Sequence, residues 1–145
     1  MRSWHEERHL PWSAGQMFDL VADIERYPEF LPGWTHASIA RRDGHALTVT
    51  QGVDLGILQL DFESHADLQR PEHLQISSAA GPFRRLQIDW HFKPDARDGC
   101  LVSLAVNIEM RSLLLEAAGG RLLELFTRDI YRRFRERATV LYGSN

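Results

Sequence analysis

A change in hydrophobic period constrains the fold of this 145-residue chain more than any other feature. Apolar residues recur every three or four positions before about residue 32 and after Arg111, whereas they alternate with polar residues between about Trp34 and Met110. The first spacing is typical of an amphipathic helix, and the second of a strand with one face in water. The sequence therefore predicts helices on both sides of a central block of strands.

The central alternation is regular enough to assign faces to the strands. Apolar residues that share one face are Leu58, Leu60, Phe62, Ala66 and Leu68, then Leu86, Ile88, Trp90 and Phe92, then Val102, Leu104, Val106, Ile108 and Met110. The acidic residues of these runs fall on the opposite face. Short links rich in Gly, Pro and Asp join the runs, which favours an antiparallel meander. With shorter runs at 47–53 and 74–76 and a weaker one at 3–10, we expect one strand, a pair of helices and six further strands.

The first helix has a strong start signal and an unusual end. Ser13-Ala-Gly-Gln16 has the form of a capping box. We expect the helix to stop at Pro28, because proline cannot continue a helix. The segment around Pro28 and Pro32 carries large apolar residues, and it is predicted to form an apolar lid from Tyr27, Phe30 and Leu31.

The last third of the chain predicts one long helix after Ser112. Its apolar residues are three or four apart: Leu115, Ala118, Leu122, Phe126, Ile130, Phe134, Ala138 and Leu141. Unbroken to Tyr142, such a helix is roughly 45 Å long. Gly119-Gly120 interrupts it, and we predict a bend there because glycine weakens a helix.

This layout is α+β, and it raises the question of what covers the sheet. Six or seven strands make a sheet roughly 30 Å wide, whereas one helix is about 10 to 12 Å across. The uncovered apolar face must curl inward, be plugged by the lid, or line a pocket. The predicted inner wall holds Phe62, Phe83, Leu86, Trp90, Leu122 and Phe126, with Thr48, Thr50, Ser64 and Ser78 as polar interruptions. A ligand pocket and a simply filled core both fit this pattern.

Composition excludes several classes of function. The net charge of -3 gives no general signal for nucleic acid, and no DNA partner is predicted. The sequence lacks an apolar run long enough to span a bilayer and a signal-peptide core, so we expect a cytoplasmic protein. The single cysteine, Cys100, is interpreted as a core residue.

No motif for catalysis or for a cofactor is present. The seven histidines show no metal-ligand spacing, so no metal is predicted. The chain has no glycine-rich phosphate loop and no nucleophile elbow, and its acidic residues are predicted to face water. We therefore expect binding rather than catalysis and no cofactor, although a cyclase that acts by shape stays open.

Arginines gather near the C-terminus, including Arg128, Arg132 and Arg135. Their positive charge is partly balanced by the nearby acidic residues Glu124, Asp129 and Glu136. One interpretation is therefore a solvated helix face. The other is a docking stripe for anionic lipid headgroups or for ribosomal RNA phosphates.

Taken in order, several motifs resemble a known family. They are Phe18-Asp-Leu-Val-Ala-Asp23, Tyr27-Pro-Glu-Phe-Leu-Pro32, Gly81-Pro-Phe83, Trp90-His-Phe92 and Phe134-Arg-Glu-Arg-Ala138. They are similar to those of the coenzyme Q-binding START-like proteins, a family also labelled polyketide cyclase/dehydrase, lipid transport protein and ribosome association toxin. The likeness spans nearly the whole chain, as one START-like domain over residues 1–145. One departure lies at Gly33-Trp34, where many members have Trp-Cys after the proline.

The resemblance implies a helix-grip fold of the START/Bet v 1-like kind, in which a curved antiparallel sheet wraps a long C-terminal helix. It implies an apolar tunnel that binds ubiquinone or another polyprenyl or lipid molecule in support of respiration. This is a non-enzymatic chaperone role, and we expect it at the surface of the inner membrane. Carried over by position, Tyr27, Phe30 and Leu31 form the tunnel mouth, Phe83 a facing flap, and Leu122 and Phe126 the helical wall. The predicted ligand-binding residues are these six together with Trp34 and the inner-wall residues Phe62, Leu86 and Trp90. A ribosome-association toxin and a polyketide cyclase or aromatase remain the alternatives.

Overall fold

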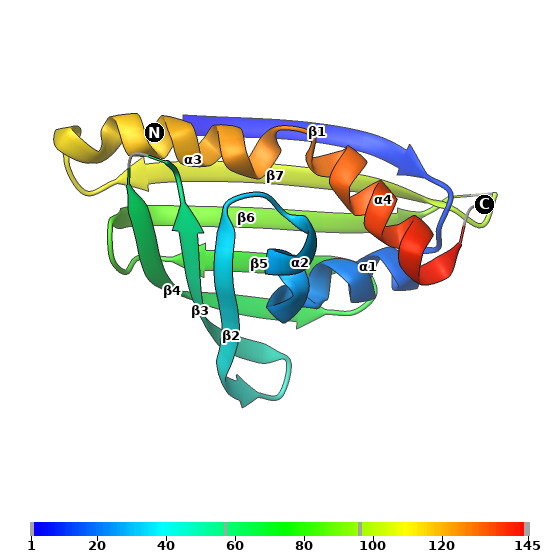
Figure 1. The fold of residues 1–145 in the computed structure, drawn as a ribbon. Helices are drawn as coiled ribbons and strands as arrows, with labels where there is room; N and C mark the ends of the chain where they lie inside the picture. Colours follow the sequence, from blue (N-terminus) through cyan, green and yellow to red (C-terminus); the bar gives the residue numbers. More distant parts are fainter. Residues whose placement is uncertain (1, 57, 96, 144–145) are drawn as a thin grey trace.

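The computed structural model describes residues 2–56, 58–95 and 97–143, which form one seven-stranded sheet with helices packed on it (Figure 1). The strands are β1 Arg2–Leu10, β2 Trp34–Asp43, β3 Ala46–Asp54, β4 Gln59–Gln69, β5 His73–Ser78, β6 Phe83–Pro94 and β7 Cys100–Met110. The helices are α1 Ala14–Ala22, α2 Tyr27–Phe30, α3 Glu116–Thr127 and α4 Ile130–Tyr142, with 3-10 turns η1 Ile24–Arg26 and η2 Leu113–Leu115.

The sheet confirms the predicted meander. Its strand order is β1-β7-β6-β5-β4-β3-β2, and every neighbouring pair is antiparallel. Strands β2 to β7 therefore follow one another along the sheet. The first strand returns to the far edge and pairs with β7, with Trp4 opposite Val106.

The predicted faces of the strands also hold, with two exceptions. The inward residues of β7 are buried at every second position, and Asp61 and Glu63 of β4 are exposed. Leu58 lies before β4 and is 39% exposed. Thr48 and Thr50 lie on the outer face, because they alternate with the buried Leu47 and Val49, so they do not interrupt the inner wall.

Helix α1 begins at the predicted capping box. The Ser13 hydroxyl accepts a hydrogen bond from the Gln16 backbone N–H, and the Gln16 side chain accepts one from the Ser13 N–H. The prediction that this helix stops at Pro28 was wrong, because α1 ends at Ala22. Pro28 instead lies in the first turn of α2, where a missing N–H leaves no helical hydrogen bond unmade.

The predicted bend at Gly119-Gly120 was also wrong. Helix α3 runs through both glycines, and the break comes at Arg128 and Asp129, where Asp129 has a left-handed φ of 54°. A Cβ at Gly119 would lie 2.8 Å from Cγ of Met110. The glycine therefore lets α3 approach β7 closely. The break turns α4 away from α3 and across the sheet towards α1 (Figure 1).

Contacts at the end of α4 fix this second direction. The Tyr142 hydroxyl donates a hydrogen bond to the backbone carbonyl of Gln16 in α1. The Trp12 indole N–H donates to the carbonyl of Gly143. Two rods at an angle, together with α1 and α2, thus cover the inner face of the sheet.

Candidate ligand-binding site

An apolar cavity lies between the sheet, α2 and the two C-terminal helices. Its volume is about 40 Å³, whereas pockets for small ligands are roughly 300 to 1,000 Å³. The residues that line it are Tyr27, Leu31, Trp34, Ile76, Ile88, Trp90, Leu104, Val106, Phe126, Ile130 and Phe134. The void is therefore small, and the wide tunnel implied by the resemblance is not open in this conformation.

The structure brings half of the predicted ligand-binding residues to this cavity. Those that line it are Tyr27, Leu31, Trp34, Trp90 and Phe126. The others, which pack elsewhere in the core or at its edge, are Phe30, Phe62, Phe83, Leu86 and Leu122. Phe83, the expected facing flap, is fully buried and packs edge-to-face on Phe62 with ring centroids 5.0 Å apart. Ligand contact by any of the ten stays a prediction.

Sequence reasoning missed six lining residues: Ile76, Ile88, Leu104, Val106, Ile130 and Phe134. Their inward direction was predictable from the period of two in the strands and of 3.6 in the helix. Which part of the inner face lies opposite the lid was not, since that depends on where α4 turns after Asp129.

Residues 27–31, which we call the flap, close the cavity on one side. The Tyr27 ring packs edge-to-face on Phe30, Trp34 and Phe134, each with centroids 6.0 Å apart. Its hydroxyl donates to the carbonyl of Val21 in α1. Burial raises the pKa of Tyr27 well above the usual tyrosine value, so the hydroxyl keeps its proton and the flap stays tied to α1.

The flap is also fastened to α4. The Phe30 ring packs edge-to-face on the Phe134 ring, with centroids 5.3 Å apart. The Arg137 guanidinium lies 5.2 Å from the centre of the Phe30 ring. Arg137 is also 3.7 Å from the Glu29 carboxylate. These contacts between the flap and α4 would have to break for the cavity to open at the flap.

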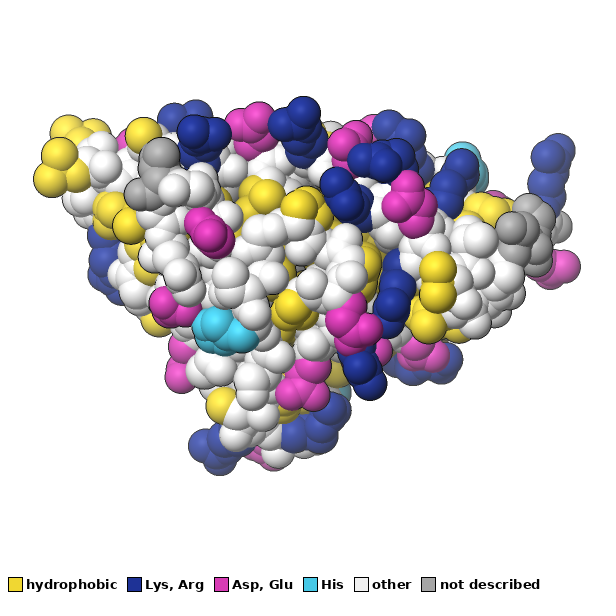
Figure 2. All heavy atoms as spheres, viewed as in Figure 1, with side chains coloured by type: hydrophobic (Ala, Val, Ile, Leu, Met, Phe, Trp, Pro, Cys, Tyr) yellow, Lys and Arg dark blue, Asp and Glu magenta, His cyan; other side chains and the backbone are white. Residues whose placement is uncertain are grey.

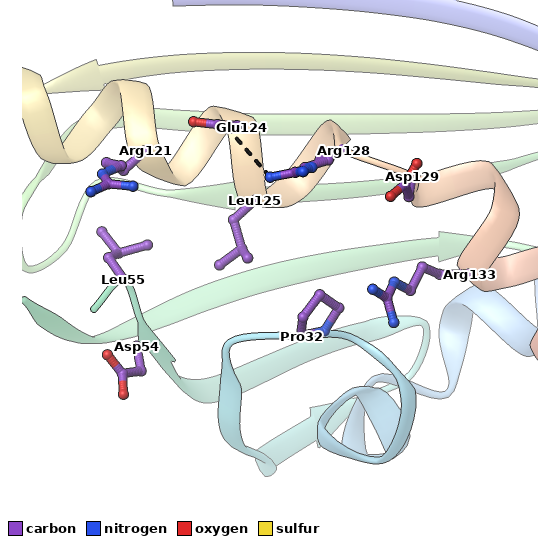
Figure 3. Close-up of a pocket in the computed structure, with 9 residues that line it drawn as sticks. All are labelled: Pro32, Asp54, Leu55, Arg121, Glu124, Leu125, Arg128, Asp129 and Arg133. Carbon is purple, nitrogen blue, oxygen red and sulfur yellow. Dashed lines mark ion pairs between the residues drawn. The ribbon is translucent and has the colours of Figure 1, made fainter. Parts of the chain in front are cut away.

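A groove of about 340 Å³ lies outside the flap, between α3, α4 and the loops that follow α2 and β3 (Figure 3). It is lined by Pro32, Asp54, Leu55, Arg121, Glu124, Leu125, Arg128, Asp129 and Arg133. Several of these directly neighbour cavity residues in sequence, as Pro32 follows Leu31 and Leu125 precedes Phe126. The outer groove and the inner cavity are therefore lined by consecutive residues of the same segments.

Buried polar groups near the cavity are already satisfied. The Trp34 indole N–H donates to the Gln51 side-chain oxygen at 3.0 Å, and the Gln51 amide donates to the Ser64 hydroxyl at 2.9 Å. Among the described residues that line the cavity, only Tyr27 is ionisable, and its hydroxyl is engaged by Val21. The lining thus offers no free general acid or base in this conformation.

Three potential metal ligands lie together on the outer face of β5 and β6. His73, Asp89 and His91 place one ligand atom each within 4.8 Å of the others. The two imidazoles stack with centroids 4.2 Å apart and planes 9° apart, so their in-plane nitrogen lone pairs do not converge on one point. Asp89 already accepts from Gln87 and faces His73. The prediction of no metal site stays a prediction.

The C-terminal arginines are largely engaged with acidic neighbours. Arg132 contacts Asp129 and Glu136 at 3.1 Å each, and Arg128 lies 3.9 Å from Glu124. Arg135 has no ion pair within the described part of the chain. This pairing favours a solvated helix face over a continuous docking stripe.

An exposed apolar tip, which the sequence analysis missed, lies at the opposite end of α3. Leu113 and Leu114 of the turn η2 are 91% and 94% exposed. Apolar atoms gather at the end of the molecule where α3 begins, at the upper left of Figure 2. The period of 3.6 could not reveal this exposure, because η2 precedes the helix that packs on the sheet.

Cys100 lies at the start of β7 and is fully buried, as predicted. Burial raises the pKa of its thiol to about 11. The thiol is therefore protonated at neutral pH and is a packing group rather than a nucleophile.

The sequence matches a known family. The family model described as polyketide cyclase/dehydrase and lipid transport matches residues 10–135. The chain belongs to this family. The predicted START-like resemblance is thereby confirmed.

Named relatives cover most of the chain. The ribosome association toxin RatA of Pseudomonas aeruginosa is 32% identical and aligns over 92% of this chain and 93% of its own length. The persistence and stress-resistance toxin PasT of Escherichia coli is 30% identical over 93% of this chain and 85% of its own. The coenzyme Q-binding protein COQ10 homolog B of Xenopus laevis is 24% identical over 97% of this chain and 59% of its own.

Solved structures confirm the predicted α+β helix-grip fold. The Zhui aromatase/cyclase from a Streptomyces species superposes with a TM-score of 0.81 at 14% identity, covering 99% of this chain and 98% of its own. A START superfamily protein from Mycobacterium smegmatis superposes with a TM-score of 0.78 at 16% identity, covering 96% of this chain and 98% of its own. At these identities the likeness concerns the fold alone. None of the helices that the structure describes is long and apolar enough to cross a membrane.

Proposed function

We propose that this protein binds ubiquinone or another polyprenyl or lipid molecule in its interior and catalyses no reaction on it. The observation that carries the proposal is the small apolar cavity behind the flap, whose lining residues are next in sequence to residues that line the outer groove. The family description includes lipid transport, and one relative is named as a coenzyme Q-binding protein. These names support an apolar guest.

Binding requires the cavity to enlarge. A void of about 40 Å³ is much smaller than the pockets that enclose small ligands. We infer that the flap moves away from α4, breaking the contact of Phe30 with Phe134. The aromatic faces thus uncovered would pack against the ligand, which offsets part of the cost of opening.

Tryptophan fluorescence tests this proposal, because Trp34 and Trp90 both line the cavity. Titration with a short-chain ubiquinone should quench their emission in a saturable way. Val106→Phe, which fills the cavity from β7, should weaken binding at least tenfold. Val102→Ala removes buried volume from the same strand outside the lining, and it should lower stability but leave binding intact.

Either of two results would contradict the proposal. The first is no saturable quenching of the wild-type protein by ubiquinone or by a polyprenyl lipid. The second is equal weakening by Val106→Phe and Val102→Ala, since it would mean that the cavity itself does not hold the quencher. A urea midpoint measured for each variant separates loss of folding from loss of binding.

We further propose that the ligand is exchanged at a bilayer, with the protein acting at the cytoplasmic side of the inner membrane. Leu113 and Leu114 favour this, because two adjacent leucines that are over 90% exposed are a natural point of insertion. Arg84 and Arg111 are also exposed, and Arg111 is anchored by hydrogen bonds to the backbone of Gly81 and Ala79.

Ribosome association is the second candidate. It is favoured by the similarity to RatA and PasT over more than 90% of this chain. Under this proposal the protein binds a ribosomal subunit and blocks subunit joining. Sucrose-gradient profiles after overexpression should show fewer 70S particles and more free subunits, and an unchanged profile would contradict it.

The cyclase or aromatase alternative has the fold of Zhui in its favour, but the described residues that line the cavity offer no free general acid or base. We do not propose it.

A further inference from the structure

We propose that the outer groove binds the phosphate of an amphiphilic ligand whose apolar tail enters the cavity. This inference rests on the proposed function and narrows its ligand class to polyprenyl or acyl phosphates. It starts from two arginines. The guanidinium groups of Arg121 and Arg133 lie on either side of Leu125 at the groove (Figure 3).

The acidic residues of the groove are engaged elsewhere. Glu124 is 3.9 Å from Arg128, the Asp129 carboxylate is 3.1 Å from Arg132, and Asp54 accepts a hydrogen bond from the Gly56 N–H at 2.8 Å. In the described residues, neither Arg121 nor Arg133 has an ion pair of its own. Two guanidinium charges are thus left without a local carboxylate partner.

The side chain of Arg133 gives more specific evidence for an anionic ligand. Its Nε–H is buried and has no hydrogen-bond partner. A buried donor left unpaired is costly, and native structures contain few of them. A small rotation of the Arg133 side chain towards the groove would let a phosphate oxygen pair this donor, and guanidinium and phosphate match in both charge and geometry.

The sequence order of the lining connects this headgroup site to the cavity. Arg133 lines the groove, and the next residue, Phe134, lines the cavity. A phosphate held by Arg133 would place its first tail carbons beside Leu125, which lines the same groove, and the tail would reach Phe134 only on entering the cavity. The groove of about 340 Å³ has room for a phosphate or diphosphate and the start of a chain. A neutral quinone ring would leave both charges uncompensated.

A matched pair of ligands tests the inference on the full-length protein. Farnesyl phosphate and farnesol share one tail and differ only in the headgroup, and calorimetry gives the affinity for each. We expect farnesyl phosphate to bind at least tenfold more tightly than farnesol. Arg133→Met should remove most of this preference and leave the affinity for farnesol unchanged.

Arg135→Met is the matched control. Arg135 lies on the same helix, is exposed and is outside the groove, so the control should keep the full preference for phosphate. Removing the buried unpaired donor should leave the urea midpoint of Arg133→Met unchanged or raise it. A loss of preference in Arg133→Met therefore cannot come from unfolding.

The outcomes separate this inference from the proposed function. Equal affinity for the two ligands, or a preference that survives Arg133→Met, would overturn the phosphate site while the apolar site stands. Inorganic phosphate that binds as tightly as farnesyl phosphate would also overturn it, because the tail would then contribute nothing. If neither ligand nor ubiquinone binds, the proposed function itself fails.

Discussion

Gly33 lies just after the flap, where the loop that follows α2 meets α3. It follows the flap with a φ of +87°, and a Cβ there would lie 2.7 Å from Cδ2 of Leu125. The Leu125 side chain therefore packs directly against the Gly33 backbone. This contact joins α3 to the loop after α2, at the boundary between the outer groove and the inner cavity.

Gly33→Ala should accordingly loosen the closed state. The left-handed φ alone costs roughly 1–2 kcal/mol for a residue with a Cβ, and Leu125 must also move. We expect a lower urea midpoint together with faster release of bound ligand in stopped-flow measurements.

Gly44→Ala is the control for this substitution. Gly44 also has a positive φ, of +61°, but a Cβ there would meet nothing within 4 Å. This variant should lose stability from backbone strain and release ligand at the wild-type rate. Equally fast release in both variants would show that Leu125 is not part of the closure.

Two buried tyrosines should make the fold sensitive to alkaline pH. Burial raises the pKa of Tyr27 and of Tyr131 above the usual value of 10.0. Above about pH 10 the unfolded chain releases these protons while the folded chain keeps them, so the unfolded state binds fewer protons and stability falls as pH rises.

The free energy of unfolding should therefore decline from pH 9 to pH 11, as measured by urea denaturation. Tyr27→Phe should reduce the steepness of this decline, although the lost hydrogen bond to Val21 lowers stability at every pH. An identical slope in the variant and the wild type would contradict the assignment.

Among the elements, the pairing of α2 with α4 controls access to the cavity. Phe30 is only partly buried, yet it contacts Tyr27, Phe134 and Arg137. Its contacts fasten one helix to another rather than fill the centre of the core. The flap can thus be weakened without removing the support of the sheet.

Phe30→Asp should weaken ligand retention more than it weakens folding. The carboxylate cannot pack on Phe134, but at the partly exposed edge it remains hydrated, so we expect a modest fall in the urea midpoint. Retention of a bound polyprenyl lipid through gel filtration should drop several-fold. Losses of equal size in both measurements would mean that Phe30 is a core residue only.

The turn η2 is the second element with a testable role. Leu113→Asp combined with Leu114→Asp should lower co-sedimentation with phosphatidylglycerol vesicles about tenfold, because apolar insertion is replaced by repulsion of like charges. Val140→Asp is the control, since Val140 is 76% exposed on α4, away from η2. If the double variant in η2 binds vesicles as well as the Val140→Asp control does, Leu113 and Leu114 have no part in docking.

For the whole molecule, the regular patterns were predictable and the covering of the sheet was not. The alternation along β4, β6 and β7 and the capping box at Ser13 are local, so they predicted the strands, the meander and the start of α1. The break at Asp129 is not local. Gly119 is required by the contact of α3 with Met110, which no pattern within the helix reveals.

The same break explains what was right and wrong about the site. We expected one long helix, bent at Gly119-Gly120, to leave much of the sheet bare. Because α4 turns at Asp129, the two rods and the flap cover the inner face and leave a void of about 40 Å³. The turn also places Arg133 at the outer groove, a position that the spacing of the C-terminal arginines in the sequence did not predict.

The central claim is that this interior opens to hold an apolar molecule. Native mass spectrometry of the protein freshly purified from a quinone-producing host, followed by solvent extraction, tests it most directly. We predict a stoichiometric adduct that is absent or much reduced in Val106→Phe, and whose extract is a quinone or polyprenyl lipid. Protein that carries no adduct, and takes up none after incubation with ubiquinone and polyprenyl phosphates, would contradict the account.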